Sequence, residues 1–333
     1  MENKKIILID SNNIAYRAFY ALPQTIITST GQMTNAVYGF ISMLLKLIEE
    51  QRPDVIICAF DSKGLTFRHE TYDDYKSTRK KMPDELISQI SIIKEVTDSM
   101  NIKSIEMEGY EADDIIATLA KNCKKNFSEI LIVSSDKDIL QLVSDNIKVI
   151  ALKKGITDTI LYDASEVKKK FKVSPYNIKD LLALMGDSSD NIPGIAGIGP
   201  KTAFNLISEF GNLNEIYKNV DKIKNEKLKK LLISEKEQAY KSLELTELKD
   251  DLEINFKDAF KSGIKDIDLS RTEEIFTSLE FNTLKKRLKN LFSANFFSNK
   301  INTAKTEDKN IKKNNDSFNK IKSGIQDFQI NSL

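Results

Sequence analysis

The stretch KKIILID (residues 4–10) decides the fold, because four consecutive apolar residues end there at an aspartate. Two later stretches repeat the arrangement, VIICAFD (55–61) and EILIVSSD (129–136). Each apolar run is continuous rather than alternating, which is typical of parallel strands with helices on both faces. Helical patterns lie between and around these runs at 35–51, 84–96 and 113–123. The alternation predicts an α/β fold with a mostly parallel central sheet flanked by helices.

Acidic residues follow each of the three predicted strands. Asp10 ends the first, Asp61 the second, and Asp136 with Asp138 follows the third. One aspartate after a strand is usually a helix cap or a turn residue. In open α/β sheets, however, ligands bind outside the carboxyl ends of the strands. Three such positions in one sheet therefore predict an acidic site at this edge.

A further acidic cluster opens the helix predicted in GYEADDIIATLA (109–120). Glu111, Asp113 and Asp114 fall within four positions. Acidic side chains near a helix N-terminus gain about 0.3–1 kcal/mol from the helix dipole, so a solvated helix start is one interpretation. Three carboxylates this close also repel one another. That repulsion favours a bound cation.

Composition limits the class of protein. The chain has 333 residues, 41% hydrophobic and 30% charged, which is enough for a large core and two domains. We expect no membrane segment and no signal peptide, since MENKKIILID runs directly into a strand pattern. Cys58 and Cys123 are too few for a disulfide framework, which favours the cytoplasm. The net charge of +1 does not by itself indicate nucleic acid.

The segment IPGIAGIGPKTAFNLISEFG (192–211) predicts a helix–hairpin–helix element. Gly197 and Gly199 permit a tight turn, and Pro200 suits the first turn of a helix. The N–H groups of that helix, together with Lys201, would hold a DNA phosphate without reading sequence. An ordinary glycine–proline turn is the alternative.

Two carboxylates precede this element in GDSSDN (186–191). Asp187 and Asp190 are three positions apart. A capping or turn role explains each of them taken alone. Beside an acidic pocket, Asp190 becomes a candidate metal ligand.

The segment TFRHETYDDYKSTRKKMPDEL (66–86) interleaves basic and aromatic residues. Its basic residues are Arg68, Lys76, Arg79, Lys80 and Lys81, and its aromatic residues are Phe67, Tyr72 and Tyr75. Basic side chains follow phosphates and rings stack on exposed bases, although a solvated charged helix has similar composition. His69 is the only histidine, and we expect it on the surface without a catalytic role.

The residue inventory selects the chemistry. Many carboxylates without a usable histidine favour hard cations such as Mg²⁺ or Mn²⁺. Two such ions about 3.5–4 Å apart would activate a water and stabilise the leaving oxygen in phosphodiester hydrolysis.

Six stretches together resemble the 5′→3′ exonuclease domain of bacterial DNA polymerase I, a member of the flap endonuclease family. They are LIDSNNIAYRAFYALP (8–23), AFDSKGLTFR (59–68), YKSTR (75–79), GYEADDIIATLA (109–120), SSDKDILQLV (134–143) and GDSSDNIPGIAGIGPKTA (186–203). The resemblance covers roughly residues 4–290. It implies a PIN-like 5′-nuclease domain at 1–162 with a helical arch at about 62–85, and a helical DNA-binding subdomain at 163–293. Residues 294–333 are rich in Asn and Lys and are expected to form a disordered tail or linker.

The resemblance also implies roles for individual residues. The metal-binding carboxylates would be Asp10, Asp61, Glu111, Asp113, Asp114, Asp136, Asp138, Asp187 and Asp190. Substrate steering and stacking would fall to Arg17, Arg68, Tyr75, Lys76 and Arg79, and DNA contacts to Lys80, Gly197, Gly199, Lys201 and Thr202. The carbonyls of Ile195 and Ile198 would hold K⁺. His69 and the SSDKD stretch depart from the family pattern without touching a proposed ligand.

The expected activity is cleavage of DNA 5′ flaps and 5′ ends, including RNA–DNA hybrids, in RNA-primer removal and excision repair. A monomer with two Mg²⁺ or Mn²⁺ ions is expected, with a functional link to a DNA polymerase. The chain is either a stand-alone nuclease or part of a longer polymerase. Competing hypotheses are a non-catalytic DNA-binding module and a metal-dependent ribonuclease. The nine carboxylates argue against the first and the duplex-binding hairpin against the second.

Overall fold

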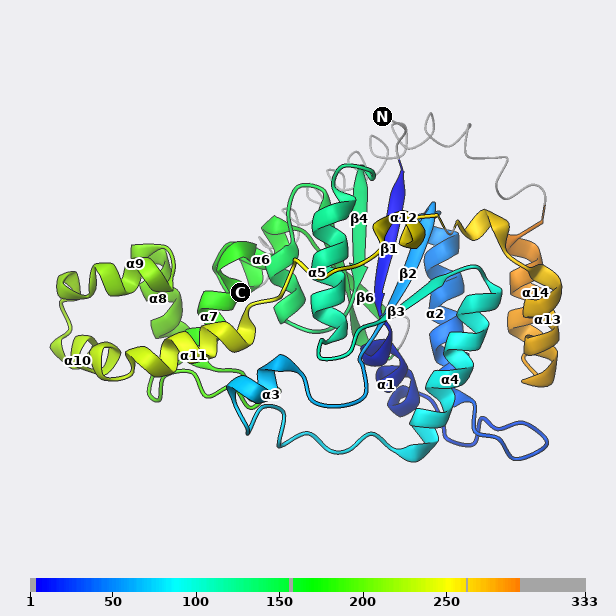
Figure 1. The fold of residues 1–333 in the computed structure, drawn as a ribbon, viewed down its shortest axis with the longest axis horizontal. Helices are drawn as coiled ribbons and strands as arrows, with labels where there is room; N and C mark the ends of the chain where they lie inside the picture. Colours follow the sequence, from blue (N-terminus) through cyan, green and yellow to red (C-terminus); the bar gives the residue numbers. More distant parts are fainter. Residues whose placement is uncertain (1–3, 156–157, 262, 294–333) are drawn as a thin grey trace, which may run out of the picture. The chain divides into compact units, whose positions relative to one another are not determined.

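The computed structural model describes residues 4–155, 158–261 and 263–293, and its strands form a six-stranded sheet (Figure 1). The strand order is β3-β2-β1-β4-β5-β6. The strands are β1 (Lys5–Asp10), β2 (Val55–Phe60), β3 (Lys103–Glu106), β4 (Glu129–Val133), β5 (Ile147–Lys154) and β6 (Asp158–Tyr162). All neighbouring pairs are parallel except β5 and β6. The predicted α/β fold with a mostly parallel sheet is confirmed.

The three strands predicted from the sequence form the centre of this sheet. β1 pairs with β2 on one side and with β4 on the other. Asp10 stands opposite Ala59 and Ile9 opposite Val133, so the three strands end nearly level. The residues that follow them therefore leave the sheet at one edge.

Strands β3, β5 and β6 were not expected from the sequence. β3 is a four-residue strand, KSIE, with charged residues at both ends and no continuous apolar run. β5 contains only the short run VIAL between lysines. β6 is an edge strand whose residues are mostly exposed. Weak apolar signal at sheet margins explains why these strands were missed.

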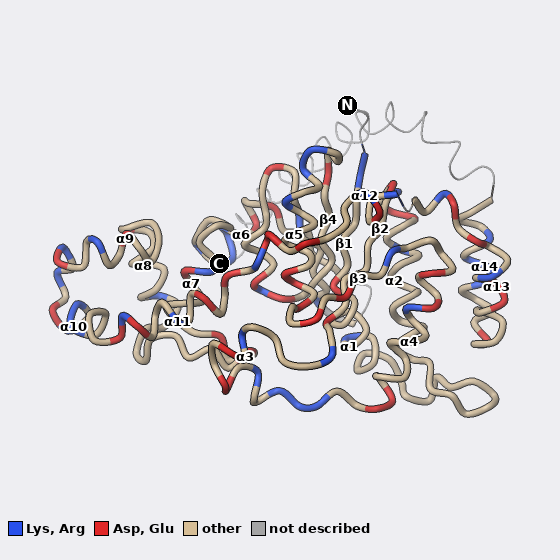
Figure 2. Tube along the Cα trace, viewed as in Figure 1, with Lys and Arg blue, Asp and Glu red and all other residues tan. Residues whose placement is uncertain are grey.

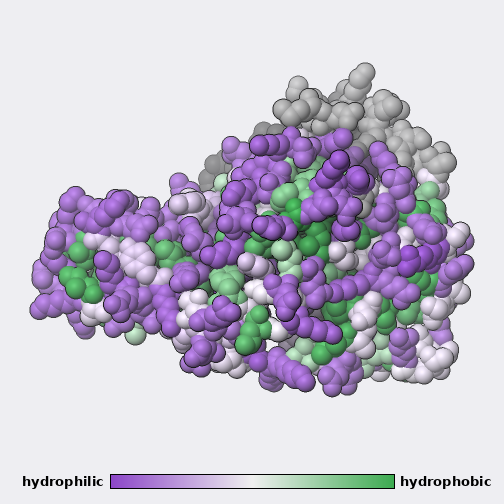
Figure 3. All heavy atoms as spheres, viewed as in Figure 1, coloured by the Kyte–Doolittle hydropathy of each residue, from purple (hydrophilic) through white to green (hydrophobic). Residues whose placement is uncertain are grey.

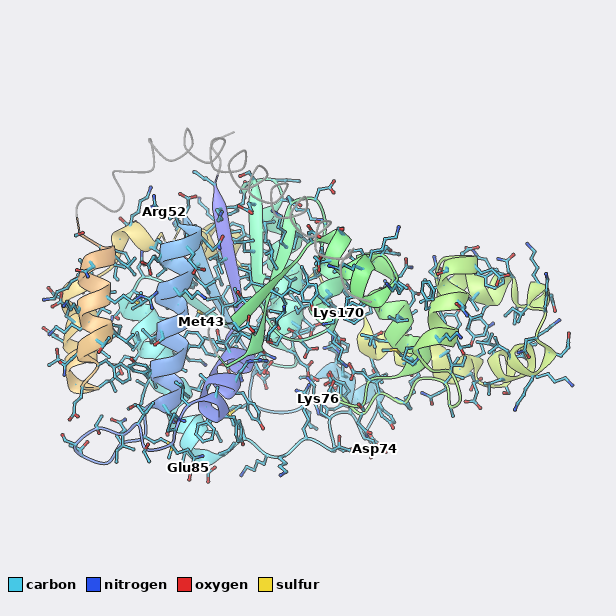
Figure 4. The ribbon with its side chains drawn as sticks, turned by 180° about the vertical axis from the view of Figure 1, so that it is seen from behind. Met43, Arg52, Asp74, Lys76, Glu85 and Lys170 are labelled. Carbon is cyan, nitrogen blue, oxygen red and sulfur yellow. The ribbon has the colours of Figure 1, made fainter. Side chains whose placement is uncertain are left out.

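Helices cover both faces of the sheet. Ile6 and Leu8 of β1 belong to the same buried cluster as the apolar residues of α5 (Ala112–Cys123). Ile7 and Ile9 are equally buried but lie outside that cluster, as expected for alternate residues of one strand. On their side pack α1 (Ser11–Ala21), α2 (Asn35–Gln51) and α4 (Asp84–Ser99), seen from behind in Figure 4.

The second half of the chain is helical, as predicted. It contains α6 (Ala164–Phe171), α7 (Ile178–Met185), α8 (Pro200–Phe210), α9 (Leu213–Lys218), α10 (Glu226–Ser234), α11 (Lys236–Thr246), α12 (Phe256–Ala259), α13 (Leu269–Ser278) and α14 (Asn282–Leu291). Short 3₁₀ turns occur at Asp138–Leu142, Pro175–Asn177, Val220–Lys222 and Ile264–Asp266. Leu181 of α7 and Leu206 of α8 belong to the same buried cluster as α5, so one core joins sheet and helices.

The expected helical arch is mostly not helical. Within 62–85 the structure has only α3 (Phe67–Thr71) before α4 begins at Asp84, and the rest consists of turns and extended backbone. Closely spaced charged residues and Pro83 explain the weak helical tendency. The basic positions of this segment are drawn blue in Figure 2.

Residues 1–281 and 282–333 form two separate compact units. The expected boundary near residue 162 falls inside the first unit and stays a prediction. The expected tail at 294–333 lies outside the described residues. Within the described ranges, no helix combines the length and apolar character that crossing a bilayer requires. Figure 3 shows mainly hydrophilic residues on the visible face, with hydrophobic residues in separate patches.

Candidate active site

A cavity of about 500 Å³ opens at the predicted acidic edge of the sheet. It is lined by Asp10, Asn12, Asn13, Tyr16, Asp61, Lys76, Arg79, Lys80, Met82, Glu111, Ala112, Asp113 and Asp136. Five of the nine predicted metal ligands therefore share this cavity with three of the predicted cationic residues. They come from the ends of β1, β2 and β4, the start of α5 and the segment after α3.

Hydrogen bonds fix the two carboxylates that follow β1 and β2. Asp10 caps α1, with Oδ1 accepting from the Asn13 backbone N–H at 3.1 Å and Oδ2 from the Ser134 hydroxyl at 2.8 Å. Asp61 Oδ1 accepts from the Ala112 backbone N–H at 2.9 Å. Asp10 thus retains the capping role typical of its position, Asp61 accepts from the first residue of α5, and both also line the cavity.

Two buried carboxylate oxygens have no hydrogen-bond partner among the described residues. They are Asp113 Oδ1 and Asp138 Oδ1. An unsatisfied buried polar atom costs about 1–3 kcal/mol, and more for a charged group. Such atoms are therefore rare unless a ligand, an ion or water completes them.

Burial and mutual repulsion raise the pKa of most carboxyls at this edge. Burial, followed by the charge of Asp61, raises the pKa of Asp10 to about 7. Desolvation is also the main cause of the raised pKa values of the buried Asp138, the half-buried Asp113 and Asp136, and the exposed Asp61 at the cavity rim, with neighbouring carboxylates adding to it. The protein alone does not neutralise this cluster. A positive ligand would.

Cations from the segment after α3 compensate part of this charge. Lys76 Nζ lies 2.7 Å from Glu111 Oε1 and 3.7 Å from Asp190 Oδ2. Burial opposes ionisation of Glu111, but Lys76 and Arg68 outweigh it and lower its pKa. The Tyr75 hydroxyl lies 3.1 Å from both carboxylates, and Arg79 pairs with Asp190. Lys76 is labelled in Figure 4.

The last two predicted carboxylates lie beside the cavity rather than in its lining. Asp187 binds the Lys137 ammonium through both oxygens at 2.8 Å. Burial would raise its pKa, but Lys137 and Ser189 outweigh burial and lower it. Asp190 is held by Tyr75 and Arg79. Across the residues that the structure describes, no three carboxylate, histidine or cysteine side chains are already arranged to hold one ion.

The positions of Asp114 and Arg68 favour roles other than the predicted ones. Asp114 is fully buried and lines no part of the cavity, so a metal-ligand role does not fit its position. Arg68 is only 2% exposed and forms a bidentate ion pair with Asp114. A DNA contact does not fit that position either. Both residues were predicted from their place in a motif, which does not report burial.

Arg17 also lies differently from the prediction. Its Nε donates to the Gly155 carbonyl at 3.0 Å and its Nη2 to the Lys153 carbonyl at 2.5 Å. Both bonds hold the end of β5 and the turn that follows it. In this structure Arg17 supports this turn, and its expected substrate-steering role stays a prediction.

The predicted helix–hairpin–helix turn is present between α7 and α8. Gly197 has a φ of +91°, a left-handed conformation that favours glycine. Gly199 does not need this freedom, because it has a φ of −92° as the N-cap of α8. Pro200 is the first residue of α8, and Lys201 is exposed in its first turn beside the half-buried Thr202. The side chains of Ile195 and Ile198 are buried.

Several lining residues were not predicted. Asn12, Asn13 and Tyr16 follow Asp10 within two turns of α1, and Met82 lies just before α4. Lys137 stands between two predicted ligands in SSDKD and was also missed. Proximity to Asp10 and Asp136 in the sequence was the available signal. His69, expected on the surface, is half-buried and its Nδ1 accepts from the Thr66 backbone N–H at 3.1 Å.

Two solved structures with a similar fold contain bound DNA. A flap endonuclease of bacteriophage T5, in a pseudo-enzyme-product complex with DNA and metal ions, matches with a TM-score of 0.63 at 21% identity. The match covers 83% of this chain and all of that one. Human GEN1 in complex with Holliday junction DNA matches with a TM-score of 0.59 at 14% identity, over 86% of this chain and 70% of that one. At these identities the likeness concerns the fold.

Sequence comparisons identify the family. Residues 5–172 match the 5′-3′ exonuclease N-terminal resolvase-like domain, and residues 173–274 match the 5′-3′ exonuclease C-terminal SAM fold. The 5′-3′ exonuclease of Aquifex aeolicus is 40% identical over 87% of this chain and 96% of its own length. DNA polymerase I of Bacillus subtilis is 43% identical over 86% of this chain. This chain spans about a third of the polymerase's length. The chain belongs to the 5′-3′ exonuclease family and is a nuclease.

Proposed function

We propose that this nuclease hydrolyses phosphodiester bonds at DNA 5′ flaps, nicks and free 5′ ends with the help of two divalent cations. The observation that carries the proposal is the acidic cavity with its uncompensated buried oxygens. A protein that only bound DNA would gain nothing from these carboxylates, because they repel phosphate. A bound cation converts the same residues into a phosphate-binding centre.

The donor set fits hard cations. Every candidate ligand is a carboxylate oxygen, the preference of Mg²⁺ and Mn²⁺. The orphan oxygens of Asp113 and Asp138 are suited to accept such a cation. Two ions would be held by residues drawn from Asp10, Asp61, Glu111, Asp113, Asp136, Asp138, Asp187 and Asp190. When bound, such ions lower the pKa of water and stabilise the leaving oxygen.

The cationic residues of the cavity would position the substrate. Lys76 and Arg79 now pair with Glu111 and Asp190. Once divalent cations hold these carboxylates, both side chains can turn their donors to the phosphates on either side of the scissile bond. Lys80 lies at the same wall of the cavity and adds charge there. Tyr75 is only 3% exposed and its hydroxyl contacts Glu111 and Asp190, so its ring would stack on a base of the 5′ strand only if those carboxylates moved onto the cations.

The helical region would hold the duplex. The first turn of α8 offers N–H groups together with the exposed Lys201 and Thr202. Backbone contacts of this kind fix register without selecting sequence. Gly197 allows close approach, and the carbonyls of Ile195 and Ile198 would bind K⁺ that bridges to a phosphate.

The cellular role would be removal of RNA primers and excision repair in the bacterial cytoplasm, near the nucleoid. This role follows from the similarity to DNA polymerase I. The nuclease would act together with a DNA polymerase. RNA–DNA hybrids would therefore also be cleaved. We propose that the enzyme acts as a monomer.

A cleavage assay tests the proposal. A 5′-labelled flap duplex is incubated with the whole chain and Mg²⁺, and in parallel with EDTA. We expect a labelled product cut near the flap junction with Mg²⁺ and none with EDTA. Tight binding of the flap without cleavage in either condition would favour a non-catalytic module instead.

A further inference from the structure

The side chain of Arg68 joins three segments of the chain beneath the acidic cavity. It is the largest fully buried side chain in the part of the chain that the structure describes. We propose that Arg68 and Asp114, here called the Arg68–Asp114 bracket, are positioning residues that set the geometry of the metal-binding carboxylates. The proposal rests on the proposed function.

The bracket uses nearly all the donors of the guanidinium group. Nη1 and Nη2 donate to the two oxygens of Asp114 at 2.7 and 2.8 Å, in the planar fork geometry that arginine favours. Nε donates to the Leu245 carbonyl at 2.9 Å, and Nη2 also to the Glu247 carbonyl at 3.2 Å. Lysine could not reproduce this pattern, because it lacks the planar fork.

The oxygens of Asp114 are equally occupied. Oδ1 also accepts from the Lys249 backbone N–H at 2.9 Å, and Oδ2 from the Glu111 backbone N–H at 3.2 Å. Each oxygen thus has two donors. Donors approaching from several sides leave a metal ion little access, whereas the adjacent Asp113 keeps an oxygen without any donor. Neighbouring residues of a helix point in different directions, which separates the two roles.

The bracket fixes the start of α5, where the cavity ligands Glu111 and Asp113 lie. It holds the Glu111 backbone through Asp114, and Arg68 Nη1 lies 3.5 Å from Glu111 Oε2. Arg68 itself belongs to α3, just before the segment that carries Lys76 into the cavity. The bracket therefore holds both the proposed metal ligands Glu111 and Asp113 and the segment that carries Lys76.

The bracket also ties this centre to the helical region. Leu245 is in the last turn of α11, and Glu247 follows its end. α11 packs along α7, and α7 ends at Met185, just before the turn that carries Asp187 and Asp190. Ligands from both halves of the chain are thus held in one frame. Supporting residues of this kind typically change metal affinity 10- to 100-fold when removed.

Two single variants and their combination test the bracket on the whole chain. Arg68→Met and Asp114→Asn are each titrated with Mn²⁺ by calorimetry. We expect both to weaken Mn²⁺ binding by about 10-fold or more, as for other residues that support metal ligands. Both substitutions break the same unit. The double variant should therefore bind Mn²⁺ no more weakly than the more affected single variant. Flap affinity measured in EDTA should stay within a factor of two.

A matched control uses an exposed ion pair between α5 and the segment after α11, which the bracket also joins. Lys121 near the end of α5 contacts Asp250 at 2.8 Å, and both side chains are about half exposed. Asp250→Asn should leave Mn²⁺ affinity unchanged. Arg68→Lys, which retains the charge but not the fork, should still bind Mn²⁺ more weakly than the wild-type chain. This conservative variant answers the question if Arg68→Met does not fold.

Three results would overturn the bracket. Arg68→Met with unchanged Mn²⁺ affinity, beside a weakened Asp114→Asn, would make Asp114 a direct ligand. Weaker flap binding in Arg68→Met, with a salt dependence reduced by about one phosphate contact, would make Arg68 a DNA contact. Unchanged Mn²⁺ affinity in both variants would remove any positioning role.

Hydrogen exchange separates the bracket from the proposed function. In metal-free protein we expect faster amide exchange at residues 111–114 in Arg68→Met and Asp114→Asn, but not in Asp250→Asn. A wild-type chain that bound no Mn²⁺ and cleaved no flap would overturn the proposed function. Exchange would still decide whether the bracket holds the start of α5.

Discussion

Asp113 and Asp114 are neighbours in α5, yet they belong to two regions with opposite electrostatics. Asp114 lies in the Arg68–Asp114 bracket, where four donors surround its two oxygens. Asp113 lies at the cavity, where one oxygen has no donor and other carboxylates raise its pKa further after burial. Asp114 is fully buried, whereas Asp113 is half-buried and lines the cavity, so the two neighbours differ in exposure as well as in their hydrogen-bond donors.

The two aspartates show that a buried charge can serve either to hold the fold together or to bind a ligand. Where the protein supplies its own counterion, the charge fixes the fold. Where it does not, the charge is held ready for a ligand, and the metal-free protein is less stable for it. This predicts that removing the two charges has opposite effects on stability.

The largest effect is expected for Asp114→Asn. This change removes the bidentate partner of Arg68 and leaves only the longer contact to Glu111 at 3.5 Å, and breaking a buried pair in this way typically costs about 3–5 kcal/mol. Chemical denaturation of the metal-free protein measures the loss. Asp250→Asn is the matched control and should cost at most about 1 kcal/mol, since Lys121–Asp250 is an exposed pair. Equal losses in the two variants would contradict the comparison.

Asp113→Asn should lower activity but raise the stability of the metal-free protein. Flap cleavage with Mg²⁺ should fall by at least about 100-fold, the loss typical when reacting groups are misplaced. Flap binding should persist, and the metal-free variant should melt at a higher temperature than the wild-type chain because a repelled buried charge is gone. Normal cleavage by this variant would show that the metal-site assignment is wrong.

The pH dependence of stability sharpens the same contrast. Asp10 has a pKa of about 7 in the folded chain against 3.8 as the ordinary value. Between these values the unfolded chain releases the proton first, so the free energy of unfolding falls as pH rises from about 4 to 7, by up to about 1.4 kcal/mol per pH unit. Melting in EDTA should show this fall. Asp10→Asn should make the fall smaller, because the other raised carboxyls remain, and Mg²⁺ should reverse it. A flat wild-type profile would contradict the raised pKa.

The smallest effect concerns the helical region, away from the cavity. Lys201→Ala should weaken duplex binding to a similar extent for all sequences and lower the salt dependence by about one phosphate contact. Fluorescence anisotropy at several salt concentrations measures both. Lys121→Ala removes an exposed lysine from α5 and serves as control. A sequence-dependent loss would argue against a backbone contact at Lys201.

The sequence predicted those features that depend on a short stretch of chain alone. Continuous apolar runs predicted the three central strands, and the aspartates that end them predicted the cavity. Motif position could not reveal that Arg68 and Asp114 face each other, because their pairing depends on contacts across the fold. The contacts of Arg17 were hidden for the same reason, since its acceptors Lys153 and Gly155 lie more than 130 residues away. The margins of the sheet failed because β3 and β6 bury little apolar surface.

The bracket has a consequence for synthesis of the chain. Arg68 and its acceptor Leu245 are 177 residues apart, and Lys249 must also be in place to complete the environment of Asp114. Domains fold progressively from the N-terminus as the ribosome extends the chain. The sheet can therefore assemble while the anchor of its metal ligands is still missing. The nascent chain would therefore acquire the proposed frame of metal ligands only after residues 245–249 have been made.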